Sequence, residues 1–126
     1  MDKKKILVVD DEPDFLELIR VRLEANNYEV ITACNGKEGL EKARQEEPDA
    51  VLLDILMPQL DGFAVLREIR SYNKNLPVFI ITSFCDEEKF KLANKLCASG
   101  FIVKTNDLCK EVNNITCILN GAGNKQ

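Results

Sequence analysis

The stretch Ala50-Val51-Leu52-Leu53-Asp54 is an apolar run of strand length that ends in an acid. A continuous run of this kind is typical of a strand that is buried on both faces of a parallel sheet. The same pattern occurs in residues 6–9 and 78–81 and, in shorter or more polar form, in residues 28–32 and 101–103. The sequence therefore predicts five strands.

Segments in which apolar residues recur at helical spacing alternate with these strands. They begin at Pro13 and after Gly62, and they cover residues 36–47, 86–98 and 107–119. Strands that alternate with helices of this length form an α/β fold, a doubly wound parallel sheet with helices on both faces. We expect one domain over residues 1–120, followed by a flexible tail at 121–126.

Composition narrows the classes of function. The chain has 126 residues and a net charge of -4, so it lacks the basic surface that direct nucleic-acid binding needs. No apolar run approaches the ~20 residues of a membrane span, and no signal peptide precedes the first strand. The five cysteines are odd in number and have no histidine to complete a zinc site. We expect a cytoplasmic protein with reduced thiols and no membrane contact.

The absence of histidine also restricts the chemistry. It excludes Ser-His and Cys-His nucleophile pairs and the usual imidazole base. The remaining reactive groups are carboxylates, lysine, hydroxyls and a metal ion that prefers oxygen ligands.

These residue types gather where the predicted strands end. Asp10-Asp11-Glu12 follows the first strand, Asp54 ends the third, Thr82-Ser83 ends the fourth and Lys104 follows the fifth. The carboxyl ends of parallel strands meet at one edge of the sheet, where ligands bind. Converging acids repel each other, so a positive group must lie among them, either Lys104 or a hard cation such as Mg²⁺.

Four stretches resemble, in order and spacing, the response-regulator receiver family of bacterial two-component signalling. They are Val8-Val9-Asp10-Asp11-Glu12-Pro13, Leu52 to Gly62, Ile81-Thr82-Ser83 and Gly100 to Lys104. The string D-x-x-M-P-x-x-D-G from Asp54 to Gly62 is the most specific part. The resemblance covers residues 4–119, and it implies a chemotaxis-regulator-like, flavodoxin-like five-stranded sheet of order 2-1-3-4-5 with five helices.

The resemblance also implies a function. Asp54 would accept a phosphoryl group from the phosphohistidine of a sensor histidine kinase or a histidine phosphotransfer protein, with Mg²⁺ or Mn²⁺ as cofactor. Asp11 corresponds to the direct metal ligand and Asp10 to a ligand that acts through water, while Asp54 and the main-chain carbonyl of Leu56 complete the set. Such a protein is a signalling phospho-acceptor and catalyses only its own phosphorylation and dephosphorylation.

The remaining roles concern the signal. Thr82 and Lys104 correspond to the groups that bind phosphoryl oxygens, and Thr82 with Phe101 to the switch that alters the face of the fourth helix, fifth strand and fifth helix. That face would act on a downstream protein or a fused output domain. Leu56 and Phe84 correspond to the positions that flank the path of hydrolytic water. Neither can orient a water, which predicts slow loss of phosphate.

Two residues depart from the family pattern. Thr105 stands where the family has a proline after a cis bond, and because a cis bond before a non-proline residue costs ~3–4 kcal/mol, we expect Lys104–Thr105 to be trans. The direction in which the Lys104 side chain points is therefore left open. Phe101 cannot donate a hydrogen bond, so coupling to Thr82 would act by packing.

Three alternatives remain open. A haloacid-dehalogenase-like phosphatase also uses an aspartate at a strand end, but it needs an acid at the place of Leu56. A flavodoxin-like redox carrier would need a phosphate cradle where Asp10 and Asp11 stand. A pseudo-receiver, an interaction module that takes no phosphate, is favoured only by Thr105.

Overall fold

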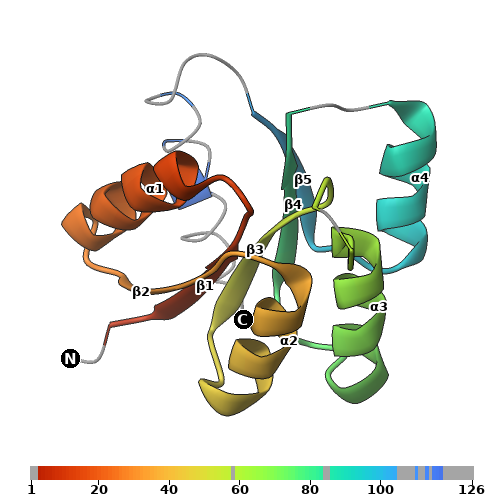
Figure 1. Cartoon of the computed structure of the whole chain (residues 1–126), viewed down its shortest axis with the longest axis horizontal. Coiled ribbons are helices and arrows are strands. Elements are labelled where there is room, and N and C mark those ends of the chain that lie inside the picture. Colours follow the sequence, from red (N-terminus) through yellow and green to blue (C-terminus); the bar gives the residue numbers. More distant parts are fainter. Residues whose placement is uncertain are drawn as a thin grey trace.

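The computed structural model describes residues 3–57, 59–83, 86–104, 110, 113 and 115–117. The strands are β1 (Lys5–Val9), β2 (Glu29–Ala33), β3 (Ala50–Asp54), β4 (Val78–Thr82) and β5 (Gly100–Val103). The helices are α1 (Pro13–Ala25), α2 (Gly36–Gln45), α3 (Gly62–Tyr72) and α4 (Glu87–Lys95). All neighbouring strands are parallel, and their order β2-β1-β3-β4-β5 confirms the predicted one (Figure 1).

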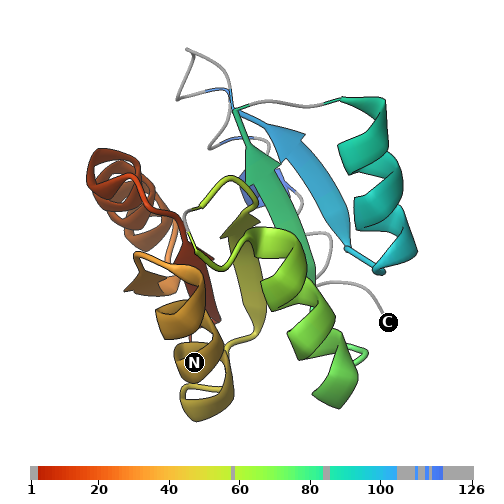
Figure 2. The same cartoon turned by 45° about the vertical axis from the view of Figure 1, so that its right-hand side comes forward.

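Side chains that alternate along the strands make two cores. Leu7 and Val9 of β1 point into a core that also holds buried residues of α2, α3 and α4. Ile6 and Val8 point to the other face, where α1 contributes its buried residues Leu16, Ile19 and Leu23. Figures 1 and 2 show α1 on one side of the sheet and α2, α3 and α4 on the other. Both faces are covered, as the apolar runs predict.

Each helix begins at a residue suited to that place. Pro13 is the first residue of α1, where its missing N–H group costs no hydrogen bond. The side chains before the other helices cap them by accepting a main-chain N–H three residues on. These pairs are Asn35 with Glu38, Asp61 with Ala64 and Asp86 with Lys89.

Some boundaries differ from the sequence prediction. The strand expected at 28–32 runs from Glu29 to Ala33, and α4 ends at Lys95. Cys97 adopts a φ of 64°, which ends the α-helical path before residue 98. Glu47, with a φ of 48°, likewise lies beyond α2.

The last predicted helix, 107–119, lies only partly within the described residues. Residues 110, 113 and 115–117 are helical, and Ile115 is buried in the core beside α1. The tail at 121–126 lies outside the described residues. Among the described residues, Cys34, Cys97 and Cys117 are exposed and form no disulfide. No helix in the described ranges is long and apolar enough to cross a membrane.

Helix α4 is attached to the sheet by few side chains. Ala93 is its one buried residue, and Phe90 is 46% exposed. Burial of apolar area is the main force that holds a helix to a sheet. We therefore expect α4 to shift at a lower free-energy cost than α1 or α3, which bury three and four residues respectively.

Candidate functional site

Four of the residues singled out from the sequence meet at the carboxyl edge of the sheet. Asp10 follows β1, Asp54 and Thr82 end β3 and β4, and Lys104 follows β5. Asp10, Asp54 and Thr82 are the buried polar residues of the described chain, with 0%, 3% and 0% of their surfaces exposed. A buried charge is costly unless it is paired, so the two aspartates depend on Lys104.

Lys104 pairs with two acids at once. Its Nζ atom donates to Asp10 Oδ2 at 2.6 Å and to Glu12 Oε1 at 2.8 Å, while Asp54 Oδ2 lies 3.9 Å away. The ammonium group also lies 4.2 Å from the centre of the Phe15 ring, within cation–π range. Lys104 therefore hydrogen-bonds to Asp10 and Glu12 and forms only a longer ion pair with Asp54.

The two buried aspartates do not ionise as free carboxyls do. Burial, together with the nearby charge of Asp10, raises the pKa of Asp54 to about 6, although Lys104 and the Leu56 N–H group oppose the shift. Burial also raises the pKa of Asp10, against hydrogen bonds from Lys104 and the Glu12 N–H group. Ionisation of both carboxyls at this buried edge is therefore unfavourable without a further positive group.

Lys104 remains a cation in this environment. Burial acts to lower its pKa, but the hydrogen bonds to Asp10 and Glu12 outweigh this effect, and the pKa is raised. A permanently charged ammonium beside a carboxylate can neutralise a second anionic group that arrives there.

The acids could hold a divalent cation. Carboxylate oxygens of Asp10, Glu12 and Asp54 lie within 4.8 Å of one another. Oxygen donors at this spacing fit a hard ion such as Mg²⁺, which takes one or two carboxylates and retains water. Asp11 is half-buried and outside this group of three, although its charge also raises the pKa of Asp54.

Glu12 is the residue that sequence reasoning passed over as a member of the site. The run Asp10-Asp11-Glu12 was visible at the strand end, and its third acid could have been included on that ground. Its side chain is 61% exposed, but its carboxylate turns toward Lys104.

The proposed switch residues lie on neighbouring strands. Thr82 is paired in register with Val103, and its carbonyl oxygen accepts the N–H of Lys104 at 2.6 Å. This bond ties the end of β4 to the residue that follows β5. Phe101 is half-buried, and its ring meets that of Phe90 edge to face at 5.7 Å, so it contacts α4 by packing.

The loop after Asp54 lies against its side chain and main chain. The N–H of Leu56 donates to Asp54 Oδ1 at 3.2 Å, and the Leu56 side chain is 47% exposed. The N–H of Gly62 donates to the carbonyl of Ile55 at 3.2 Å. Phe84 and Thr105 lie outside the described residues, so the expectations about water access at Phe84 and the trans bond at Thr105 stay predictions.

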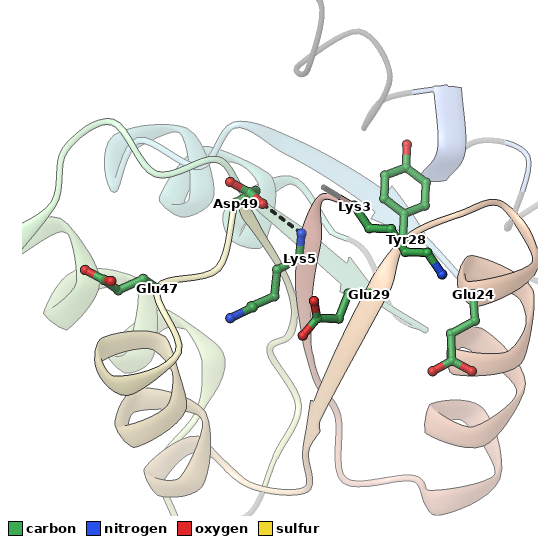
Figure 3. A pocket seen from close by; sticks show the side chains of 7 residues that line it. All are labelled: Lys3, Lys5, Glu24, Tyr28, Glu29, Glu47 and Asp49. Carbon is green, nitrogen blue, oxygen red and sulfur yellow. Dashed lines mark hydrogen bonds between the residues drawn. The ribbon is translucent and has the colours of Figure 1, made fainter. Parts of the chain in front are cut away.

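A depression at the opposite edge of the sheet differs in character (Figure 3). The N–H of Lys5 donates there to Asp49 at 2.7 Å, and the Lys5 ammonium donates to the carbonyl of Glu46 at 3.0 Å. It is lined by Lys3, Lys5, Glu24, Tyr28, Glu29, Glu47 and Asp49. These residues are of mixed charge, in contrast to the buried acids at the carboxyl edge.

The structure is thus a doubly wound α/β protein with a buried acid at the end of its central strand and a lysine and further acids beside it. The chain belongs to the response-regulator receiver family, since the family model described as "Response regulator receiver domain" matches residues 6–115. The resemblance noted from the sequence is therefore confirmed.

Individual relatives agree with this assignment. The alkaline phosphatase synthesis transcriptional regulatory protein PhoP of Bacillus subtilis is 40% identical over 101 residues, which are 80% of this chain and 42% of that protein. A receiver domain protein of Clostridium thermocellum has a TM-score of 0.86 and 33% identity, with 94% of this chain and 93% of that one covered. The response regulator TrrA of Thermotoga maritima, in complex with Mg²⁺ and BeF, has a TM-score of 0.80 and 33% identity, covering 91% and 98%.

The chain spans about two fifths of the length of the curated relatives it matches. Those relatives include regulators of transcription, and the matching part is the receiver domain.

Proposed function

We propose that this domain accepts a phosphoryl group on Asp54 and acts as the switch of a two-component or phosphorelay system. The observation that carries the proposal is the arrangement around Asp54: a buried carboxylate with a lysine 3.9 Å away and two further acids within 4.8 Å. Phosphoryl transfer needs little covalent help but much positioning and neutralisation of charge.

The transfer can be written for these residues. An oxygen of Asp54 attacks the phosphorus of a phosphohistidine on a histidine kinase or phosphotransfer protein. The P–O bond forms as the N–P bond breaks, and the histidine nitrogen leaves with the bonding electrons. Lys104 and the Thr82 hydroxyl then bind phosphoryl oxygens. Bound Mg²⁺ or Mn²⁺ would neutralise the charge that develops on those oxygens.

Asp10, Asp11, Asp54 and the Leu56 carbonyl are the proposed metal ligands. The donor set is all oxygen, which suits Mg²⁺, and the complex of TrrA with Mg²⁺ and BeF shows that a related receiver takes both. We infer the same chemistry for this chain. The domain would extend over residues 1–120 and act in the cytoplasm on a partner or a fused output domain.

The two main alternatives fit less well. A haloacid-dehalogenase-like phosphatase needs a proton-transferring acid two residues after the acceptor, and Leu56 cannot move a proton. A pseudo-receiver would need no buried acceptor, yet Asp54 retains Lys104, Asp10 and Thr82 around it.

The test is incorporation of beryllofluoride or of phosphate from a small phosphodonor. We expect one equivalent per chain only when Mg²⁺ or Mn²⁺ is present, and none in Asp54→Asn. Asp14→Asn, which removes an exposed acid from the first turn of α1, is the matched control and should react normally. Stoichiometric labelling of Asp54→Asn, seen by mass spectrometry, would refute the assignment.

A further inference from the structure

The ammonium group of Lys104 makes its hydrogen bonds to Asp10 and Glu12 and not to Asp54, the proposed phosphoryl acceptor. Two of its three N–H donors are taken by Asp10 at 2.6 Å and Glu12 at 2.8 Å. Asp54 Oδ2, at 3.9 Å, is beyond hydrogen-bond distance. The Phe15 ring covers a further side of the ammonium at 4.2 Å.

The position of Glu12 in the chain allows its carboxylate to hold the Lys104 ammonium group. It is the residue before α1, and its side chain makes no capping hydrogen bond to the start of the helix. Its own N–H donates to Asp10 Oδ1 at 2.9 Å, which fixes its main chain beside the cluster. Its carboxylate is therefore committed to Lys104 and not to the helix end.

We propose that Glu12 is a positioning residue that holds Lys104 on the Asp10 side of the site and competes with the phosphoryl group for the ammonium. The inference rests on the proposed function of Asp54. In the resting domain Glu12 supplies a partner for Lys104, and when the phosphoryl group is in place Lys104 turns from Glu12 to a phosphoryl oxygen. Glu12 thereby lowers the affinity of the site for the phosphoryl group.

Charge and reach can be separated at this position. Glu12→Gln removes the charge, whereas Glu12→Asp keeps it but draws the carboxylate back from Lys104 by the length of one methylene. Asp14→Asn removes a neighbouring exposed charge from the same segment and serves as the control for general electrostatics.

The experiment is a calorimetric titration of each variant with beryllofluoride at saturating Mg²⁺. Since an exposed ion pair contributes little net free energy, we expect both Glu12 variants to bind about two- to five-fold more tightly than the parent. Asp14→Asn should bind like the parent. A double-mutant cycle with Lys104→Met adds a second readout, because the gain from Glu12→Gln should vanish when the lysine is absent.

The results separate the two proposals. Parental affinity in Glu12→Gln, or an equal gain in the Lys104→Met background or in Asp14→Asn, would overturn the role of Glu12. Failure of the parent itself to bind beryllofluoride with Mg²⁺ would instead overturn the proposed function.

Discussion

Gly62 lies so close to Asp54 that a Cβ atom on Gly62 would stand 2.3 Å from the Asp54 carbonyl oxygen. It would also stand 2.7 Å from the Cα of Ile55. Neither neighbour is a flexible side chain that could move aside. The start of α3 is therefore packed directly on the main chain that carries the proposed acceptor.

Replacing Gly62 by alanine should push this loop away from Asp54. We expect a loss of about 1–3 kcal/mol in the free energy of unfolding, as for other overpacked sites, and weaker binding of beryllofluoride. Gly100→Ala is the control, because its Cβ would meet the Phe79 ring at 2.9 Å, far along the strand from the site. That variant should lose stability and retain its affinity. Unchanged urea unfolding and affinity in Gly62→Ala would contradict the packing argument.

The raised pKa of Asp54 predicts a stability that depends on pH. Because the pKa rises from 3.8 unfolded to about 6 folded, the folded protein binds a proton across this interval and gains stability as pH falls through it. Above about pH 7 it carries the full cost of a buried charge, so Asp54→Asn should be more stable there by roughly 1–3 kcal/mol. The gain should shrink below about pH 6 and vanish near pH 4.

Urea unfolding of the two proteins in EDTA, across this range, measures the effect. Mg²⁺ at neutral pH is a useful control, since it should stabilise the parent more than Asp54→Asn by binding the folded state. A stability difference that stays constant with pH would show that the charge of Asp54 is not its source.

Loss of the phosphoryl group should be slow, because neither Leu56 nor Phe84 can orient the attacking water. The main-chain N–H of Leu56 donates to Asp54, and Leu56 is 47% exposed. We expect the double variant Leu56→Asn, Phe84→Glu to lose phosphate about ten times faster, which corresponds to roughly 1.4 kcal/mol of barrier. The decay of labelled protein with Mg²⁺ present measures this. Decay no faster than in the parent would reject shielding by these side chains.

The signal should reach α4 and β5. Thr82 and Lys104 are joined by a main-chain hydrogen bond, Phe101 packs on Phe90, and α4 buries only Ala93 among the described residues. We expect hydrogen exchange with and without beryllofluoride to differ most in α4, in β5 and in the segment of the last predicted helix. Helix α1 provides the internal comparison. A change confined to α1 and α2 would reject this output face.

Much of the architecture could be predicted from local pattern. The apolar runs at 50–54 and 78–81 have the length and continuity of strands covered on both faces, and both are strands with every residue buried. The ends of the helices were harder to predict from the sequence. After α4 the residue with a left-handed conformation is Cys97, and neither a glycine nor a proline marks this position. Such a turn depends on packing that is not encoded in the local sequence.

The order of polar residues along the chain was enough to place Asp10, Asp54, Thr82 and Lys104 at one edge, since parallel strands bring their carboxyl ends together. The order of residues along the chain could not predict which acid would pair with Lys104. Lys104 is 92 residues from Glu12 along the chain, and the fold brings its Nζ atom to 2.8 Å from the Glu12 carboxylate. Side-chain partners across elements are set by distances of a few tenths of an ångström, and only the packed fold determines these.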